Sequence, residues 1–169
     1  MGIFLQIFLI IFFIANAEAR PISYNGGHTV MVLSDNIKNS MYYHYSPTYK
    51  YSIGLEFLED KLFNKNYSFL RLTYLLNRKN TKNSQRNLYF QSGINPERTK
   101  NIFYGIHGDW ETRRVFSGFS LKRTENGYKN YTDKFIQLGF APYLGNYGDL
   151  HSWIMIKSKT VSYTHLTLP

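Results

Sequence analysis

The chain has 169 residues, the length of a single domain, and its 20 Lys and Arg against 11 Asp and Glu give a net charge of +9. A mean hydropathy of −0.36 argues against a helical membrane protein, although it is compatible with a barrel, in which only alternate residues face lipid. The positive charge suits nucleic acid or anionic lipid equally. Because no nucleic-acid-binding motif accompanies it, we expect no nucleic-acid partner.

The first residues predict an export signal. An apolar run over residues 3–14 is broken only by Gln6, and the small residues Ala15, Ala17 and Ala19 suit a signal-peptidase site. The run is shorter than the ~20 residues with which a helix crosses a bilayer. We therefore assign residues 1–19 to a signal peptide, with a membrane anchor or an apolar first strand as the alternative.

Nine strands are predicted along the rest of the chain, separated by turn-rich segments. The runs are rich in aromatic and β-branched residues, and Asn, Gly, Pro and Asp lie between them. No segment of helical length keeps a 3.6-residue period. The predicted strands are residues 28–34, 40–46, 49–58, 67–76, 87–94, 102–110, 114–123, 134–144 and 150–158.

The strands are two-sided. In residues 50–58 the large apolar residues Tyr51, Ile53, Leu55 and Phe57 alternate with small or charged ones, and later strands repeat the pattern. So many large side chains would overfill the interior of a small barrel, whereas glycine and charges of both signs on the other face would fill it. The sequence thus predicts an antiparallel up-and-down transmembrane β-barrel. A soluble periplasmic β-barrel or sandwich that binds an apolar ligand in its interior remains the alternative.

Loop lengths support one orientation of such a barrel. The segments 46–48, 111–113 and 145–148 are short and fall on the periplasmic side, whereas 59–66, 95–101 and 124–133 are longer and fall outside. Residues 77–86 break the rule, because this segment is long and lies on the inner side. It carries Arg78, Lys79, Lys82 and Arg86 without an acidic residue, and its role is open.

Charged residues on the polar faces predict a network of paired charges in the lumen. Its expected members are Lys50, Glu56, Arg71, His107, Asp109, Glu111, Arg114 and Lys122. The alternative is a catalytic site in which His107 acts as general base with Asp109 or Glu111, and Ser117 or Ser120 is the nucleophile. Such a site would make the protein a lipid-modifying hydrolase or acyltransferase.

Two further groups of residues receive structural interpretations. His28, Met31, His44 and His151 are types that bind copper, but they are scattered, so we expect no metal and no cofactor. Tyr147 and Trp153 are expected near the inner membrane interface, where aromatic rings gather.

The last residues resemble a sequencing-library adapter translated in frame. VSYTHLTLP, residues 161–169, matches the adapter codon for codon, and Thr160 also fits. Residues 160–169 are therefore expected to be a non-native tail and residues 20–159 an incomplete barrel with its C-terminal part truncated. Since bacterial barrels have even strand numbers, about ten strands are expected in the whole protein.

Several segments resemble an uncharacterised proteobacterial outer-membrane barrel family. They are GGHTVM at residues 26–31, YSPTYKYSIG at 45–54 and APYLGNYGDLHSW at 141–153, with shorter matches at 83–85 and 108–111. The resemblance implies an outer-membrane β-barrel of a Gram-negative bacterium without an assigned activity, and so it identifies no catalytic residues. The expected partners are outer-membrane lipid, lipopolysaccharide and the barrel assembly machinery, and the expected role is structural or small-solute transport.

Overall fold

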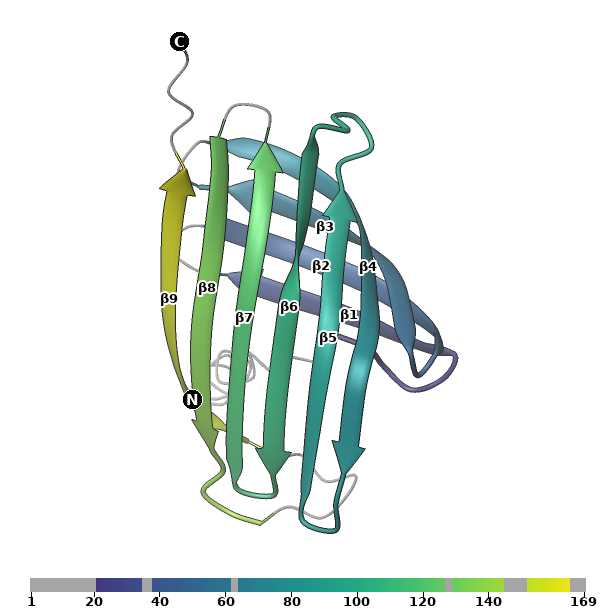
Figure 1. Cartoon of the computed structure of the whole chain (residues 1–169), viewed down its shortest axis with the longest axis vertical. Coiled ribbons are helices and arrows are strands. Elements are labelled where there is room, and N and C mark those ends of the chain that lie inside the picture. Colours follow the sequence, from purple (N-terminus) through teal and green to yellow (C-terminus); the bar gives the residue numbers. More distant parts are fainter. Residues whose placement is uncertain (1–20, 35–37, 62–63, 127–128, 145–151, 165–169) are drawn as a thin grey trace, which may run out of the picture.

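The computed structural model describes residues 21–34, 38–61, 64–126, 129–144 and 152–164. They form one antiparallel sheet of nine strands, each hydrogen-bonded to the next along the chain (Figure 1). The strands are β1 (Gly27–Ser34), β2 (Lys38–Thr48), β3 (Tyr51–Asp60), β4 (Lys65–Asn80), β5 (Ser84–Ile94), β6 (Asn101–Thr112), β7 (Val115–Asn126), β8 (Lys129–Phe140) and β9 (Ile154–Thr164).

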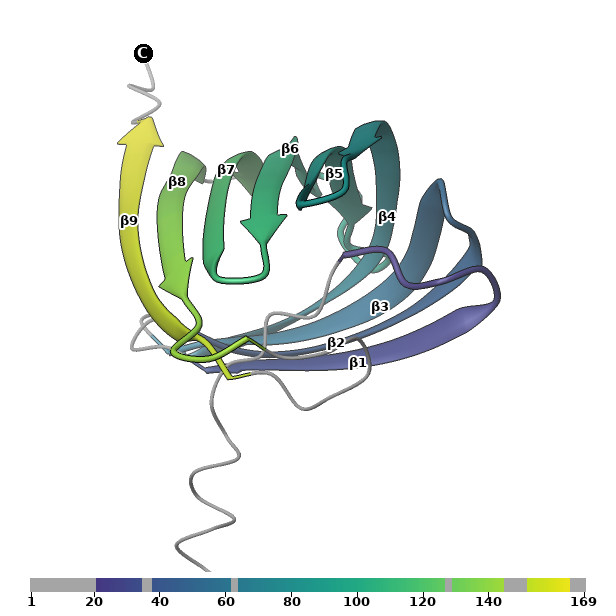
Figure 2. The ribbon, with the colours of Figure 1, turned by 90° about the horizontal axis from the view of Figure 1, so that it is seen from below.

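The sheet curls into a half-barrel around a central space (Figure 2). Strands β1 and β9 are its two edges. The predicted all-β class and the nine antiparallel up-and-down strands are confirmed. In the part of the chain that the structure describes, no helix has the length and apolarity needed to cross a membrane.

Several predicted loops are wrong, because the strands continue through polar residues. Residues 77–86 are mostly strand: β4 and β5 extend to a short turn at residues 81–83, where the Ser84 N–H donates to Thr81 Oγ1 at 3.0 Å. The expected outer loop 124–133 shrinks to the connection between Asn126 and Lys129. Conversely, the expected short turn at 145–148 lies outside the described residues, within the longer stretch that separates β8 from β9. Backbone pairing needs no apolar side chains, so the apolar pattern underestimates strand length.

The predicted alternation of faces is confirmed in the strands. In β3, Leu55 is 45% exposed on the outward face, whereas Glu56 beside it is 5% exposed on the inward face. The same holds for Leu72 and Thr73 in β4 and for Leu138 and Gln137 in β8. Throughout the sheet the outward face is therefore mainly apolar and the inward face mainly polar.

A segment before β1 packs against the inward face. Ile22 is buried with Leu75 and Tyr89. The Ser52 hydroxyl donates to the Pro21 carbonyl at 2.8 Å, and the Ser23 N–H donates to the Ser46 hydroxyl at 3.0 Å. Residues 21–23 thus occupy part of the interior of the half-barrel near the end at which β1 begins.

Strand β9 extends into the adapter-like residues. Residues 160–164 pair with residues 130–134 of β8. The apolar outward pattern stops before them: Ile156 is in register with outward Leu138, whereas Val161 and Tyr163 are in register with inward residues of β8. Any sequence can form backbone hydrogen bonds at a strand edge, whether or not it is native. The pairing of residues 160–164 with β8 therefore leaves the adapter interpretation untested.

Candidate functional site

The inward face carries a buried ion pair between neighbouring strands. Arg71 on β4 and Glu56 on β3 lie 3.0 Å apart (Nη1 to Oε2), with side-chain exposures of 13% and 6%. The Arg71 guanidinium also lies 4.2 Å from the centroid of the Tyr42 ring on β2. Because both charges are largely removed from water, each depends on the other for compensation.

A second ion pair lies further round the inward face, between β7 and β8. Lys122 Nζ on β7 is 3.7 Å from Asp133 Oδ2 on β8. The Phe103 ring on β6 connects the two pairs, because its centroid is 5.0 Å from Lys122 Nζ and 5.2 Å from the Arg71 guanidinium. The inward face thus holds a network of alternating charges and aromatic rings spanning several strands.

The structure brings together only part of the expected lumen network. Glu56, Arg71 and Lys122 meet in it, but Lys50 is exposed in the turn between β2 and β3, and Arg114 is exposed just before β7. Asp133 was missed because its segment was assigned to a loop. Continuing the alternation backwards from Gln137 would have placed it on the inward face.

Asp109 belongs to a separate chain of hydrogen bonds on the inward face. The Asn87 amide donates to Asp109 Oδ1 at 2.6 Å, and Arg78 Nε donates to Asn87 Oδ1 at 2.7 Å. Glu111, two residues further along β6, shares this face. Arg78 from the basic segment therefore turns inward to join a polar chain with Asn87 and Asp109.

Four of the catalytic candidates share one face, whereas Ser117 is in register with outward Trp110. His107 on β6 and Ser120 on β7 are direct cross-strand partners, a relation that brings Cβ atoms to about 4.5–5.5 Å. Asp109 lies two residues along β6 on the same side. The His107 ring is flanked by Tyr89 and Phe135, with ring centroids 5.9 Å away in each case. The arrangement has the residue types of a general-base site within an aromatic environment.

The metal-ligand candidates are not brought together. His28 lies on the outward face, stacked on Tyr45 at 4.7 Å and hydrogen-bonded to the Tyr43 hydroxyl at 2.7 Å. His44 and Met31 lie on the opposite, inward face, and His151 lies outside the described residues. Within the described residues no group of three His, Cys, Asp or Glu side chains could hold a metal ion.

Of the two expected interface aromatics, Tyr147 lies outside the described residues and Trp153 is half-buried. The Trp153 ring packs edge-on against Phe116 at 6.2 Å between centroids. Phe116 faces inward, in register with Glu111 and Gly139. Trp153 thus contacts the lumen side of the wall.

Inward glycines make room for aromatic rings along the wall. A Cβ on Gly93 would collide with the Phe103 ring, and one on Gly54 would collide with His44 and the Tyr42 ring. These rings lie over the glycine backbone of the neighbouring strand and fill the space that a side chain would take. The glycines on the polar face therefore have a packing role.

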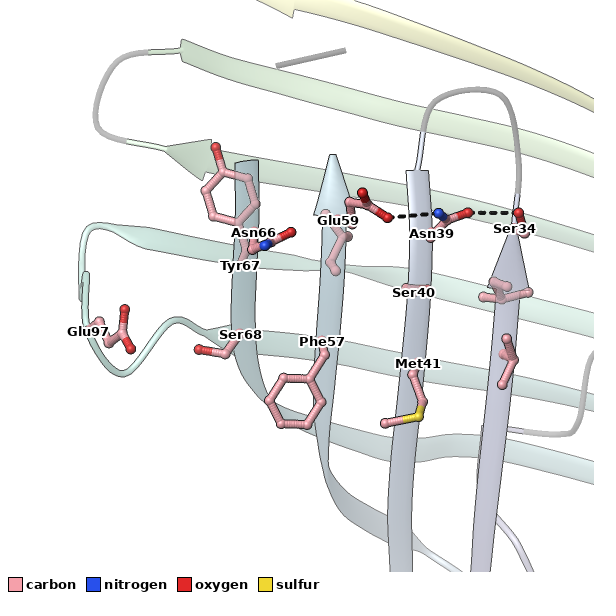
Figure 3. A pocket seen from close by; sticks show the side chains of 13 residues that line it. Ser34, Asn39, Ser40, Met41, Phe57, Glu59, Asn66, Tyr67, Ser68 and Glu97 are labelled. Carbon is pink, nitrogen blue, oxygen red and sulfur yellow. Dashed lines mark hydrogen bonds between the residues drawn. The ribbon is translucent and has the colours of Figure 1, made fainter. Parts of the chain in front are cut away.

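An open pocket of about 660 Å³ lies where β1 and β3 end and β2 and β4 begin (Figure 3). Its wall includes Met41 and Phe57. A row of hydrogen bonds crosses its rim, with the Ser34 hydroxyl donating to Asn39 at 2.7 Å and Asn39 donating to Glu59 at 2.8 Å. The pocket marks the level at which the apolar outward face gives way to polar side chains, and it lies apart from the His107 site.

No protein-family model, curated protein or solved structure matches this chain. The geometry of the two faces is therefore the basis for a functional proposal.

Proposed function

We propose that this chain is most of an outer-membrane β-barrel whose outward face contacts lipid. The supporting observation is the exposure of large apolar side chains around the whole sheet, such as Leu55 at 45%, Leu72 at 42% and Ile136 at 64%. An apolar surface of this extent is unfavourable in water. In a membrane the same surface is covered by hydrocarbon, and the polar face is turned to the lumen.

The soluble alternative required Tyr51, Ile53, Leu55 and Phe57 to be buried around an apolar ligand. Ile53, Leu55 and Phe57 are exposed, at 44%, 45% and 53%, and Tyr51 is half-buried. The inward face instead holds buried polar residues such as Ser52 and Glu56. This distribution favours the membrane barrel over an apolar-ligand carrier.

Strand direction supports a tenth strand in the complete protein. Each of the nine strands is antiparallel to the next, so β1 and β9 run in the same direction. One further strand running the opposite way would pair with both edges in antiparallel fashion and give the even number typical of bacterial barrels. In this proposal the closing strand follows residue 159 in the natural gene product.

The contents of the lumen favour a structural role over an open pore. Ion pairs and aromatic rings line the inward face, and residues 21–23 pack against it near one end. In a barrel of about ten strands, side chains alone fill much of the interior. Passage of a small solute would require residues 21–23 to move away from Ser46 and Ser52.

Membrane fractionation of the natural gene product, followed by gel electrophoresis of boiled and unboiled samples, tests the proposal. We expect recovery in the outer membrane and faster migration before boiling, because a closed barrel resists detergent. Recovery in the periplasmic fraction with equal migration would contradict a lipid-facing outward surface.

A second candidate function is hydrolysis or acyl transfer in the lumen. It is favoured by the cross-strand pairing of His107 with Ser120, with Asp109 on the same face. Ser120→Ala should then abolish turnover of ester-linked lipid while the heat-dependent gel shift remains. Full turnover by Ser120→Ala would remove Ser120 as the nucleophile.

A further inference from the structure

The end of the sheet at which β1 begins carries a concentration of positive charge. The hairpin turns β4–β5 and β6–β7 lie next to one another at this end (Figure 1). Residues 77–86 and 112–114 contain six basic residues and no acidic one; they are Arg78, Lys79, Lys82, Arg86, Arg113 and Arg114.

Two of these side chains form a like-charged pair on the outward face. Lys79 on β4 and Arg86 on β5 are direct cross-strand partners, and both are exposed. Like charges placed directly opposite each other across a sheet are destabilising. In the described part of the chain neither side chain forms an ion pair, so the positive charge of this pair is available to an external anion.

The acidic residues on the neighbouring strand β6 face the other way. Asp109 and Glu111 on β6 lie on the inward face, where Asp109 accepts a hydrogen bond from Asn87. Arg78 also turns inward and donates to Asn87. The inward charges are therefore separated by the sheet from Lys79 and Arg86.

The like-charged pair lies at the edge of the apolar outward face. Arg86 is in register with Trp110 on β6, which is 40% exposed. The next outward residue along β5 is Leu88, with Leu76 on the neighbouring strand. Indole rings prefer the boundary between headgroups and acyl chains, so this is the level of the headgroups.

We propose that Lys79, Arg86 and Trp110, named here the basic rim, bind the phosphate of an anionic phospholipid whose acyl chains lie along the outward face. The inference rests on the proposed membrane barrel and deepens it by naming the lipid class. A soluble acidic partner would explain the two charges but not their position beside Trp110 and Leu88. The exposed Lys82 and Arg114 in the adjacent turns add to the positive field.

Trp110 provides a direct probe of this site. The chain has two tryptophans, so Trp153→Phe in the natural gene product leaves Trp110 as the single tryptophan of the described residues. The barrel is refolded in phosphatidylcholine vesicles that contain increasing fractions of brominated phosphatidylglycerol or brominated phosphatidylcholine. Bromine quenches tryptophan on contact, so the two titrations report which lipid lies beside Trp110.

We expect brominated phosphatidylglycerol to half-quench Trp110 at a mole fraction about fivefold lower than brominated phosphatidylcholine, the effect of about one well-placed basic side chain. Lys79→Gln with Arg86→Gln should reduce this preference at least by half. The matched control, Arg98→Gln with Lys100→Gln, removes two exposed basic side chains from the segment between β5 and β6, at the opposite end of these strands, and should keep the preference.

Equal quenching by both lipids in the parent, or a preference that survives Lys79→Gln with Arg86→Gln, overturns the inference. Equal quenching would also leave a soluble acidic glycan or protein as the partner of the basic rim. Failure of the proposed barrel looks different, since a protein that does not insert is quenched by neither lipid and shows no gel shift on boiling.

Discussion

Replacing Leu55 by arginine gives opposite results for a lipid-facing and a water-facing outward surface. Leu55 lies in the middle of β3 and points outward, paired across the sheet with Leu70. An arginine at the midplane of a transmembrane barrel costs about 2–4 kcal/mol of the free energy of unfolding. If the outward face meets water instead, Leu55 is a surface residue that is already 45% exposed. Its replacement by arginine should then change stability by no more than about 0.5 kcal/mol.

Two control variants separate the effect of the added charge from the effects of lost apolar surface and of depth in the membrane. Leu55→Ala removes apolar surface without adding charge and should cost about 1–2 kcal/mol in lipid. Glu59→Arg places the same side chain on the same outward face, four residues nearer the strand end, where the cost in lipid falls to about 0–1 kcal/mol.

The assay is guanidinium unfolding of the natural gene product in phosphatidylcholine vesicles, followed by tryptophan fluorescence. The expected order of stability is parent, Glu59→Arg, Leu55→Ala and Leu55→Arg, from highest to lowest. If Leu55→Arg unfolds at the same denaturant concentration as the parent, the outward face does not contact hydrocarbon and the barrel proposal fails.

Three other predictions concern the lumen. Glu56→Leu should destabilise the protein by about 3–5 kcal/mol, because it leaves the Arg71 charge buried without its partner. The double variant Glu56→Leu with Arg71→Leu should recover most of this loss in the same unfolding assay. An equal loss in the single and double variants would show that the ion pair itself is not responsible. Gly93→Val should lower the free energy of unfolding by about 1–3 kcal/mol, because the new side chain collides with the Phe103 ring. In a Phe103→Ala background, Gly93→Val should cost less than it does in the parent. If the costs of the two substitutions add, the strain does not come from contact with Phe103. Ile22→Ser should loosen residues 21–23 from the inward face and raise ion conductance in planar bilayers, whereas unchanged conductance would mean that this segment does not limit passage.

Strand content and sidedness followed from local pattern. The alternation of Tyr51, Ile53, Leu55 and Phe57 with small and charged residues predicted the two faces of β3 correctly. A period of two residues is a property of the strand itself, so it can be recognised without knowing which strand lies beside it. The greater length of β4 was missed because Asn77 to Asn80 carry no apolar residues.

The composition of the candidate site depended on register. Lys122 was expected in the lumen, but its partner Asp133 is on another strand and was assigned to a loop. Lys50 was expected in the lumen network but lies in a turn. The direct pairing of His107 with Ser120 likewise follows from the alignment of β6 and β7. Each of these pairs joins residues on different strands. A shift of one residue in the register between strands would turn every side chain of a strand to the other face of the sheet.

The sequence by itself determined the all-β class, the number of strands and which residues of a strand share a face, because these depend on side-chain alternation within short segments. Only the tertiary structure decided that Arg71 pairs with Glu56, that residues 21–23 pack against the inward face, and that Lys79 lies opposite Arg86 while Arg78 turns inward. The physical reason is that these contacts are set by hydrogen-bond register between strands and by the curl of the sheet, which act across the whole chain.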